Sequence, residues 1–346
     1  MAGKQRFDYL DVSKGIGILL VVWAHILLVG WTHRLIYAFH MPLFFLISGM
    51  LYDRDKYLTF GDFFRARFKR LIVPYLIYSV VTWAIWAVFR YLQGGPVVSY
   101  WRPLLQTVIA QGSGAFMVHN SPLWFIPCLF AVEIMYFFVS KAKEGMTLML
   151  CVLIAAGGVA LTHLYGNDYL FLLPWNLDAA FYGLLFYGVG HGYRHYVGHE
   201  KTMQWVGNNG LKAGLLSLVL LVVLWLLAMN FGECSMGSSS YQCAEWLFFV
   251  RAFVGCVWLI LTCAILCSTP RLQAIIRPLK WCGVNSLDIM CLHVPIKGVA
   301  IIGLTILFHL SRAVSESAPL SAIVFALTIV ACVILTMLIN RFIRKR

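Results

Sequence analysis

The sequence predicts an all-α membrane protein with about ten transmembrane helices and both termini in the cytoplasm. The first observation is composition: 61% of the 346 residues are hydrophobic and 12% are charged. A soluble domain has about 25% charged residues. The second is a succession of apolar runs close to the ~20 residues that cross a bilayer as a helix. The third is the way that basic residues alternate between connections.

The apolar runs follow one another closely, which predicts a single integral-membrane domain over residues 1–346 with no appended soluble domain. The second run is short, glycines and aromatic residues interrupt the sixth, and Pro295 allows a broken or tilted ninth helix. The loop 93–122 has room for a short surface helix near Tyr100–Ala110. We expect spans at 11–31, 35–51, 71–92, 123–140, 147–165, 174–193, 213–230, 244–267, 284–309 and 319–340.

Basic residues gather in every second connection. With the N-terminus inside, the outer connections hold only Arg34, Arg90, Arg102 and Arg312. The inner ones hold most of the others, among them Arg54, Lys56, Arg194, Lys201, Lys212, Arg271, Arg277, Lys280, Arg341 and Arg344. Cytoplasmic loops of membrane proteins carry such an excess. The net charge of +13 therefore needs no nucleic-acid partner.

The N-terminal segment and the positions of the cysteines bear on processing and on disulfide formation. The first apolar run is longer than a signal-peptide core and no cleavage pattern follows it, so we expect Met1 to be retained. Cys234 and Cys243 lie in the polar outer loop 231–243, where an oxidising compartment would allow a disulfide. Whether the two are bonded stays open. The other cysteines lie in or beside spans, as packing residues do.

One polar pattern lies within the first span, "DVSKGIGILLVVWAH". Lys14 and His25 are eleven residues apart, about three helical turns, so they share one helix face about 16 Å apart along the axis. Asp11 lies one turn before Lys14, within pairing distance. The structural reading is a packing histidine above an interfacial ion pair. Ionisable groups are costly in a bilayer and more often mark a site, which favours a functional His25.

A second pattern is the basic stretch "FFRARFKRLIVPYL" before the third span. Arg65, Arg67, Lys69 and Arg70 are four basic residues within six positions, denser than anchoring at a membrane face requires. Arginine forks match phosphate oxygens, so the stretch is a candidate clamp for a phosphorylated cofactor, with positive-inside anchoring as the alternative.

Further polar residues lie in apolar surroundings, each of which alone is more often structural. Together they are candidates to line one polar cavity, because histidines occur on three different spans. No HxxxH or CxxC spacing supports a metal site, and no P-loop, GxSxG or dinucleotide motif is present. The candidates are His40, Ser48, Trp124, Glu133, Asn285, Ser286 and His293.

Four stretches, in order, resemble the integral-membrane acyltransferase-three family. "DVSKGIGILLVVWAH" resembles its first span, although Lys14 stands where arginine is commoner, which keeps the charge and loses the bidentate fork. "FHMPLFFLISGML" resembles its second span and "FFRARFKRLIVPYLIY" its entry to the third. "WCGVNSLDIMCLHVPI" resembles its late Asn-Ser…His segment. The second and fourth stretches are most similar to the fucose 4-O-acetylase-like branch, which modifies surface polysaccharides.

The resemblance implies an O-acetyltransferase of the bacterial inner membrane. Its donor would be cytoplasmic acetyl-coenzyme A, and its acceptor a hydroxyl of a surface glycan or a lipid-linked precursor. Lys14 and the basic stretch would bind the coenzyme head. His25 would act as general base, with an acyl-histidine left open. Asn285, Ser286, His40 and Trp124 are candidates to stabilise the oxyanion, His293 is a further catalytic candidate, and Glu133 is a candidate to orient a histidine. The candidates for substrate binding are His40, Ser48, Trp124 and Glu133.

Two other classes compete with the enzyme. A transporter or flippase for a polar glycolipid or small solute also uses intramembrane histidines, but such proteins commonly show two similar halves, and none is seen here. A membrane scaffold without chemistry accounts for neither the Lys14–His25 alignment nor the basic stretch. The acceptor sugar and the oligomeric state are not determined by the sequence.

Overall fold

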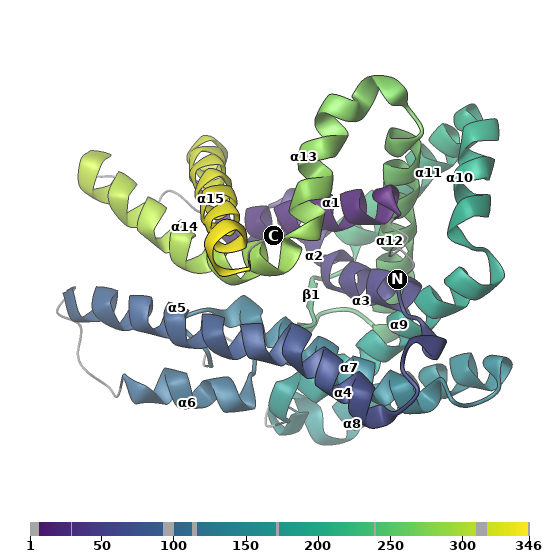
Figure 1. Ribbon diagram of the computed structural model, residues 1–346, viewed down its shortest axis with the longest axis horizontal. Coiled ribbons are helices and arrows are strands. Elements are labelled where there is room, and N and C mark those ends of the chain that lie inside the picture. The colour runs from purple at the N-terminus through teal and green to yellow at the C-terminus, as the bar shows by residue number, and fades with distance from the viewer. Residues whose placement is uncertain are drawn as a thin grey trace.

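The computed structural model describes residues 7–28, 30–92, 100–112, 116–170, 173–238, 240–308 and 317–344. Its described part is a bundle of helices with one small β-hairpin (Figure 1). The strands are β1 (Cys234–Ser235) and β2 (Ser240–Tyr241). The helices are α1 (Asp8–Ile26), α2 (Trp31–Tyr37), α3 (His40–Met50), α4 (Phe60–Arg67), α5 (Val73–Leu92), α6 (Trp101–Ile109), α7 (Phe125–Val139), α8 (Glu144–Leu170), α9 (Leu177–Tyr196), α10 (His199–Asn208), α11 (Gly210–Asn230), α12 (Glu245–Cys267), α13 (Gln273–Val284), α14 (Ser286–Phe308) and α15 (Ala318–Leu338).

The predicted all-α membrane fold is confirmed. Eight helical segments among the described residues are long and apolar enough to cross a membrane, and they contain α1, α5, α7, α8, α11, α12, α14 and α15. The shorter α3 and the more polar α9 fall at the second and sixth predicted spans, so the helices follow the predicted order of ten. Helix α6 occupies the expected surface segment. Helix α14 continues through Pro295 without the break that the proline allowed.

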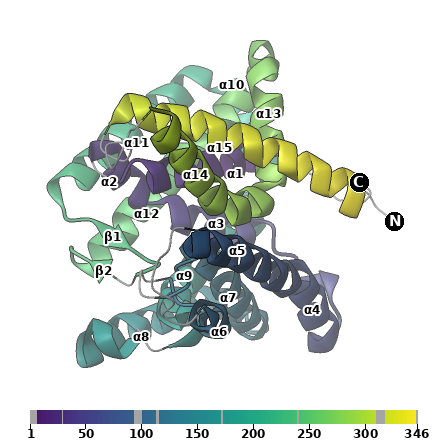
Figure 2. The same cartoon turned by 90° about the vertical axis from the view of Figure 1, so that its left-hand side faces the viewer.

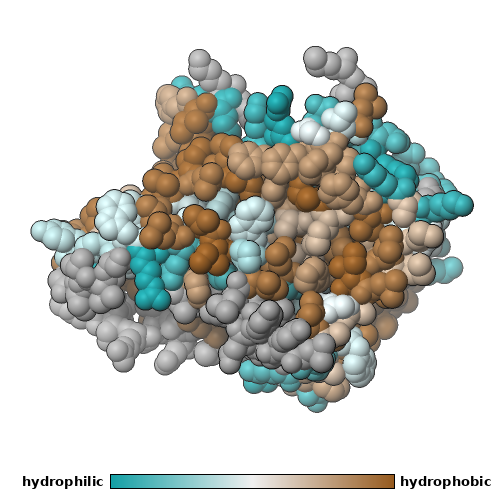
Figure 3. All heavy atoms as spheres, turned by 90° about the horizontal axis from the view of Figure 1, so that it is seen from below, coloured by the Kyte–Doolittle hydropathy of each residue, from teal (hydrophilic) through white to brown (hydrophobic). Residues whose placement is uncertain are grey.

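The outer surface of the bundle is apolar where lipid would surround it. Large hydrophobic side chains on α5 are exposed at Leu76, Ile77, Val80 and Val81, and α11 and α15 show the same pattern. Hydrophobic residues cover much of the molecular face in Figure 3. Soluble proteins rarely expose apolar patches this large, so this surface fits hydrocarbon as its solvent.

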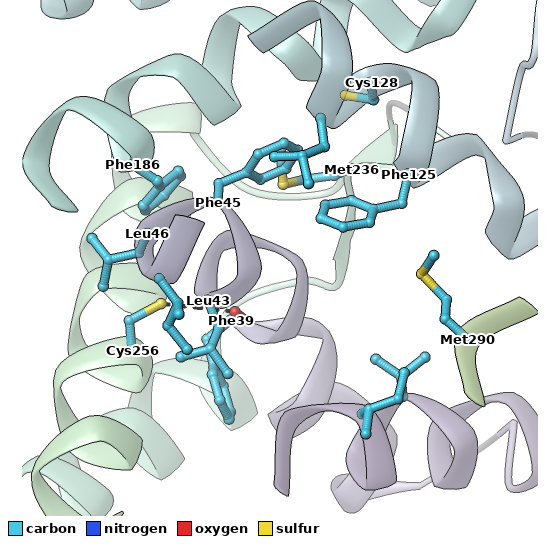
Figure 4. Close-up of a cluster of buried hydrophobic side chains, with 14 of the residues drawn as sticks. Phe39, Leu43, Phe45, Leu46, Phe125, Cys128, Phe186, Met236, Cys256 and Met290 are labelled. Carbon is cyan, nitrogen blue, oxygen red and sulfur yellow. Dashed lines mark hydrogen bonds between the residues drawn. The ribbon is translucent and has the colours of Figure 1, made fainter. Parts of the chain in front are cut away.

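Short helix α3 lies at the centre of the bundle, which accounts for the short second run. Its side chains meet those of α7, α9, α12 and the hairpin in one buried cluster, and Figure 4 shows Phe39, Leu43, Phe45, Leu46, Phe125, Cys128, Phe186, Met236, Cys256 and Met290. Gly49 of α3 faces the Tyr187 carbonyl and Gly190 of α9 faces the Leu46 carbonyl, and a Cβ at either glycine would overlap backbone. Small residues at such crossings let membrane helices approach closely.

Helix α13 packs against the first half of α1 in the same backbone-to-backbone manner. A Cβ on Gly15 would overlap the Leu279 carbonyl, and a Cβ on Gly283 would overlap the Asp11 carbonyl. Lys280 of α13 also pairs with Asp8 at the start of α1. Helix α13 therefore fixes the end of α1 that carries Lys14.

The first and last described residues lie at one end of the molecule, which we call the basic face. At this face Tyr9 bonds His199 at the start of α10, with 2.7 Å between Oη and Nδ1. Arg344 pairs with Asp288 at the start of α14, through two contacts of 2.6 and 2.7 Å. The first and last described helices thus begin and end at the same face, as an even number of spans requires.

The opposite end, the hairpin face, carries β1 and β2 (Figure 2), whereas α6 lies alongside α5 (Figure 1). Arg251 of α12, 1% exposed, donates to the Gly232 carbonyl over 2.8 Å and so supports the base of the hairpin. The Cys234 and Cys243 sulfur atoms lie 3.0 Å apart as unbonded thiols.

A topology test follows from the two faces. We expect the basic face to be cytoplasmic because it carries the positive excess. In a cysteine-depleted background, Asn230→Cys, exposed at the end of α11 that leads into the hairpin, should react with an impermeant maleimide in intact cells. Lys56→Cys should react only after permeabilisation. Labelling of Lys56→Cys from outside would reverse or break the topology.

A disulfide between Cys234 and Cys243 is the second expected outcome, because an oxidising compartment would join thiols this close. Burial raises the pKa of the Cys234 thiol to about 12, so slow alkylation of the folded protein is not diagnostic. Alkylation after denaturation should therefore leave both thiols unmodified unless the protein is first reduced. Losing the bond should lower stability by at most ~2–3 kcal/mol. Full alkylation of both thiols in denatured, unreduced protein would contradict the predicted disulfide.

Candidate functional site

His25 lies one residue before the end of α1, and its hydrogen bond defines its tautomer. The Nδ1 atom is 2.7 Å from the Val21 carbonyl oxygen, one turn earlier. A carbonyl can only accept, so Nδ1 carries the hydrogen. In the neutral ring the lone pair is then on Nε2, for which the described residues provide no hydrogen-bond partner. A lone pair held in a fixed direction is what a general base needs.

Two other predicted histidines show the same arrangement. His40 of α3 donates from Nδ1 to the Ile36 carbonyl over 2.9 Å. His293 of α14 donates from Nδ1 to the Met290 carbonyl over 2.7 Å, and its Nε2 is buried without a partner in the described part of the chain. The His293 ring lies edge-on to His25, with 5.0 Å between centroids. Three imidazoles from three helices thus gather within one region.

A pocket of about 230 Å³ lies at this point. His25 and His40 line it together with Trp124, and Phe44 and Met290 supply apolar wall. The rest of its lining includes Ser121 and Pro122 at the start of α7 and the hairpin residues Ser235–Ser238. The pocket therefore reaches from the imidazoles at the end of α1 and the start of α3 toward the hairpin face, and it mixes hydroxyl, imidazole and apolar groups as ligand sites do.

An aromatic row joins His40 to the hairpin face. Tyr37 lies against His40, with ring centroids 4.8 Å apart, and stacks on His33 at 4.1 Å. His33 Nδ1 is 3.2 Å from a Glu233 carboxylate oxygen. That hydrogen bond lowers the pKa of Glu233 from its ordinary value, so the carboxylate stays ionised at the rim.

Lys297 of α14 is a neighbour of His25 that is not among the predicted site residues. Its Nζ donates to the His25 backbone carbonyl over 2.9 Å. The cation thus satisfies a carbonyl at the end of α1, where the helix dipole is negative, and anchors the residue that bears the imidazole. Lys297 lies one turn after His293. This four-residue spacing from an intramembrane histidine was the sequence signal that could have identified Lys297 as a site residue.

His119 and Asn120 are a second pair that the sequence analysis missed. Asn120 donates to the Cys291 carbonyl over 2.7 Å and so ties the loop before α7 to α14. His119 beside it is buried, and neither ring nitrogen has a partner among the described residues. Burial lowers the pKa of His119 to about 4, so its ring is neutral at pH 7. No periodicity signalled this loop.

The basic stretch divides into paired and exposed residues. Arg67 is buried and pairs with Glu133 of α7, with 3.3 Å between Nη1 and Oε1. Arg65, Lys69 and Arg70 are exposed at the same face. The exposed residues remain available to an anionic ligand, whereas Arg67 already has a counter-ion. Glu133 therefore pairs with an arginine, whereas the sequence suggested that it would orient a histidine.

Lys14 also has a partner, because its Nζ lies 2.6 Å from Asp11 Oδ1. The predicted one-turn pairing is thus present. Helix α1 is continuous from Lys14 to His25, so their common face and their separation of about 16 Å hold.

Three of the predicted site residues do not lie beside His25 in the structure. Ser48 lies two turns from His40 on α3 and is not among the residues that line the pocket. Asn285 accepts a 2.9 Å hydrogen bond from Asn340 and donates one to the Trp281 carbonyl. Both ends of its amide are therefore used at the basic face. Ser286 lies seven residues, about 10 Å, before His293 on α14. These contacts give Asn285 a structural role.

A second, larger cavity of about 880 Å³ opens at the basic face between the ends of α3, α7, α8 and α9. Tyr52, Arg54 and Arg194 are among its lining residues. Arg194 also donates to the Tyr52 carbonyl, which closes α9 onto the end of α3. Among the described residues no group of three or more His, Cys, Asp or Glu side chains is placed to hold a metal ion.

Comparison with known proteins identifies the family. The family model described as an acyltransferase domain matches residues 7–337. No curated protein and no solved structure matches the chain. The matched range runs from the start of α1 to the last turn of α15 and includes both polar regions, the imidazole pocket and the basic stretch. The chain is therefore a member of the acyltransferase-three family, a multi-pass membrane acyltransferase.

Proposed function

We propose that the protein is a bacterial inner-membrane O-acetyltransferase. It transfers acetyl from cytoplasmic acetyl-coenzyme A to a hydroxyl of a surface glycan or its lipid-linked precursor. Within the family, the resemblance in "FHMPLFF" and the late histidine segment favours the fucose 4-O-acetylase-like branch. The observation that carries the proposal is the neutral His25 tautomer, which leaves Nε2 of this pocket-lining residue as the proton acceptor.

The reaction needs one proton acceptor and produces one leaving thiol. His25 Nε2 takes the proton from the acceptor hydroxyl as its oxygen attacks the thioester carbonyl. The tetrahedral intermediate collapses, the carbon–sulfur bond breaks, and the proton passes from the imidazolium to the departing thiolate. The products are the acetyl ester and free coenzyme A, and His25 returns to its neutral form.

Stabilisation of the intermediate falls to donors near His25. Trp124 lines the pocket, and its indole N–H donates only. Lys297 brings a positive charge to the His25 end of α1, where the oxyanion would develop. The His293 ring packs against the His25 ring and limits its rotation, which keeps His25 Nε2 directed at the substrate. In this arrangement these residues replace Asn285 and Ser286, which lie toward the basic face.

The donor side is supported by the basic face. Arg65, Lys69 and Arg70 are exposed cations, and the lining of the larger cavity includes Arg54 and Arg194. A phosphorylated coenzyme head would be held there through charge-assisted hydrogen bonds. The thin pantetheine arm would then run beside α1, whose face connects Lys14 to His25. That arm spans the distance that separates the two polar regions.

Replacing His25 tests the catalytic assignment. His25→Ala should insert normally and still bind acetyl-coenzyme A, because the basic face is unchanged. Acetyl transfer should fall by about 10²–10⁴-fold, the usual worth of a positioned base. The matched control is His163→Ala, an exposed histidine that pairs with Glu245 away from the pocket. Near-normal transfer by a stable His25→Ala would remove His25 from the mechanism.

The basic stretch gives a paired comparison. Arg70→Ala should weaken acetyl-coenzyme A binding roughly ten- to hundredfold with little loss of stability, because one phosphate contact is lost. Arg67→Ala should instead destabilise the protein by about 3–5 kcal/mol, since it leaves Glu133 buried and unpaired. Donor titration and thermal unfolding of the two variants separate the roles. Equal donor affinity in Arg70→Ala and wild type would reduce the stretch to an anchor.

A further inference from the structure

The imidazole pocket has a roof on the hairpin face that the proposed mechanism does not use. Gly112, from the loop after α6, and Gly237, from the hairpin, both line the pocket. A Cβ on either glycine would overlap the Trp124 ring, so these two backbone segments lie directly against the indole. Two segments distant in sequence thus close one side of the pocket over Trp124.

A single side chain joins the two segments. Asn176 Oδ1 accepts from the Gly112 N–H over 2.8 Å, and Asn176 Nδ2 donates to the Gly237 carbonyl over 3.0 Å. Asn176 is 1% exposed and has φ 48°, a left-handed conformation that asparagine tolerates better than most residues. The amide uses both its acceptor and a donor, so aspartate or leucine cannot reproduce the bridge.

The hairpin depends on such contacts for its position. Its strands are two residues each, and an isolated two-stranded hairpin is marginally stable at best. Arg251 supports its base at Gly232, and Asn176 holds its tip at Gly237. Removing the Asn176 bridge therefore frees the pocket wall while it leaves the base of the hairpin attached.

The volume under the roof limits what can enter. The space of about 230 Å³ is smaller than the ~300–1,000 Å³ of typical ligand pockets. It suits one sugar ring, and a second linked ring would extend out of it. Hydroxyls of Ser121, Ser235 and Ser238 line it beside His25, and these are partners suited to sugar hydroxyls.

We infer that the roof, held by Asn176, makes the enzyme selective for a single or terminal sugar ring as acceptor. The inference rests on the proposed O-acetyltransferase function and adds the size class of its substrate. A terminal ring enters the pocket and presents its hydroxyl to His25. An internal ring of a longer chain would have to keep both of its neighbours outside the space under the roof.

The test uses purified protein, acetyl-coenzyme A and synthetic acceptors. A panel of methyl glycosides of hexoses and deoxyhexoses first identifies an acetylated ring. The linear trisaccharide of that ring is then supplied, and mass spectrometry locates the acetyl group. Wild type should favour terminal over internal rings by 100-fold or more. Asn176→Ala should reduce this ratio about tenfold, with an unchanged KM for acetyl-coenzyme A.

Controls separate a local effect from misfolding. Asn230→Ala removes an exposed asparagine that bonds only its own helix, at the hairpin end of α11, and should keep the wild-type ratio. If Asn176→Ala does not fold, Gly237→Ala provides the same test, because its Cβ displaces the hairpin from Trp124.

Three results would overturn the inference. They are equal acetylation of internal and terminal rings by wild type, an unchanged ratio in folded Asn176→Ala, and an unchanged ratio in Gly237→Ala. Absence of acetyl transfer to every sugar would remove the proposed function itself, and with it the inference.

Discussion

The hydrogen bond from the His25 ring to the Val21 carbonyl is the interaction on which the site depends. Among apolar helices an unpaired polar group costs several kcal/mol, so an imidazole in the last turn of α1 must satisfy one nitrogen within its own helix. That requirement fixes the tautomer and leaves Nε2 for chemistry. His40 and His293 obey the same constraint, and Lys297 satisfies the carbonyl of His25 itself.

The same constraint organises the charges at the basic face. Arg67 with Glu133, Lys14 with Asp11, and Arg344 with Asp288 each pair a cation that lies in or beside the bilayer. Tyr78 adds a 2.8 Å hydrogen bond to Asp288, so α5, α14 and the last helix meet at one carboxylate. Exposed cations that are left over, such as Arg65 and Arg70, are then free to meet an anionic ligand. Pairing thus separates residues that hold the fold from residues that can bind a substrate.

The sequence predicted the spans and the first-span geometry because both follow from periodicities along one helix. Lys14, His25 and the continuous α1 illustrate this. It could not predict contacts between elements distant in sequence. Nothing local shows that Glu133 meets Arg67, that Asn285 is taken by Asn340, or that Asn176 bridges Gly112 and Gly237. The second span illustrates both cases: its shortness was visible, but its central position in the bundle was not.

The central claim is that a donor from the basic face and an acceptor from the hairpin face meet at His25. Sided proteoliposomes test it most directly. With protein oriented by its topology, acetyl-coenzyme A is supplied only at the basic face and the acceptor glycoside only at the hairpin face, across a sealed bilayer. The account predicts acetylated glycoside on the hairpin side at a rate that disappears in His25→Ala. Transfer only when donor and acceptor share one compartment would contradict it.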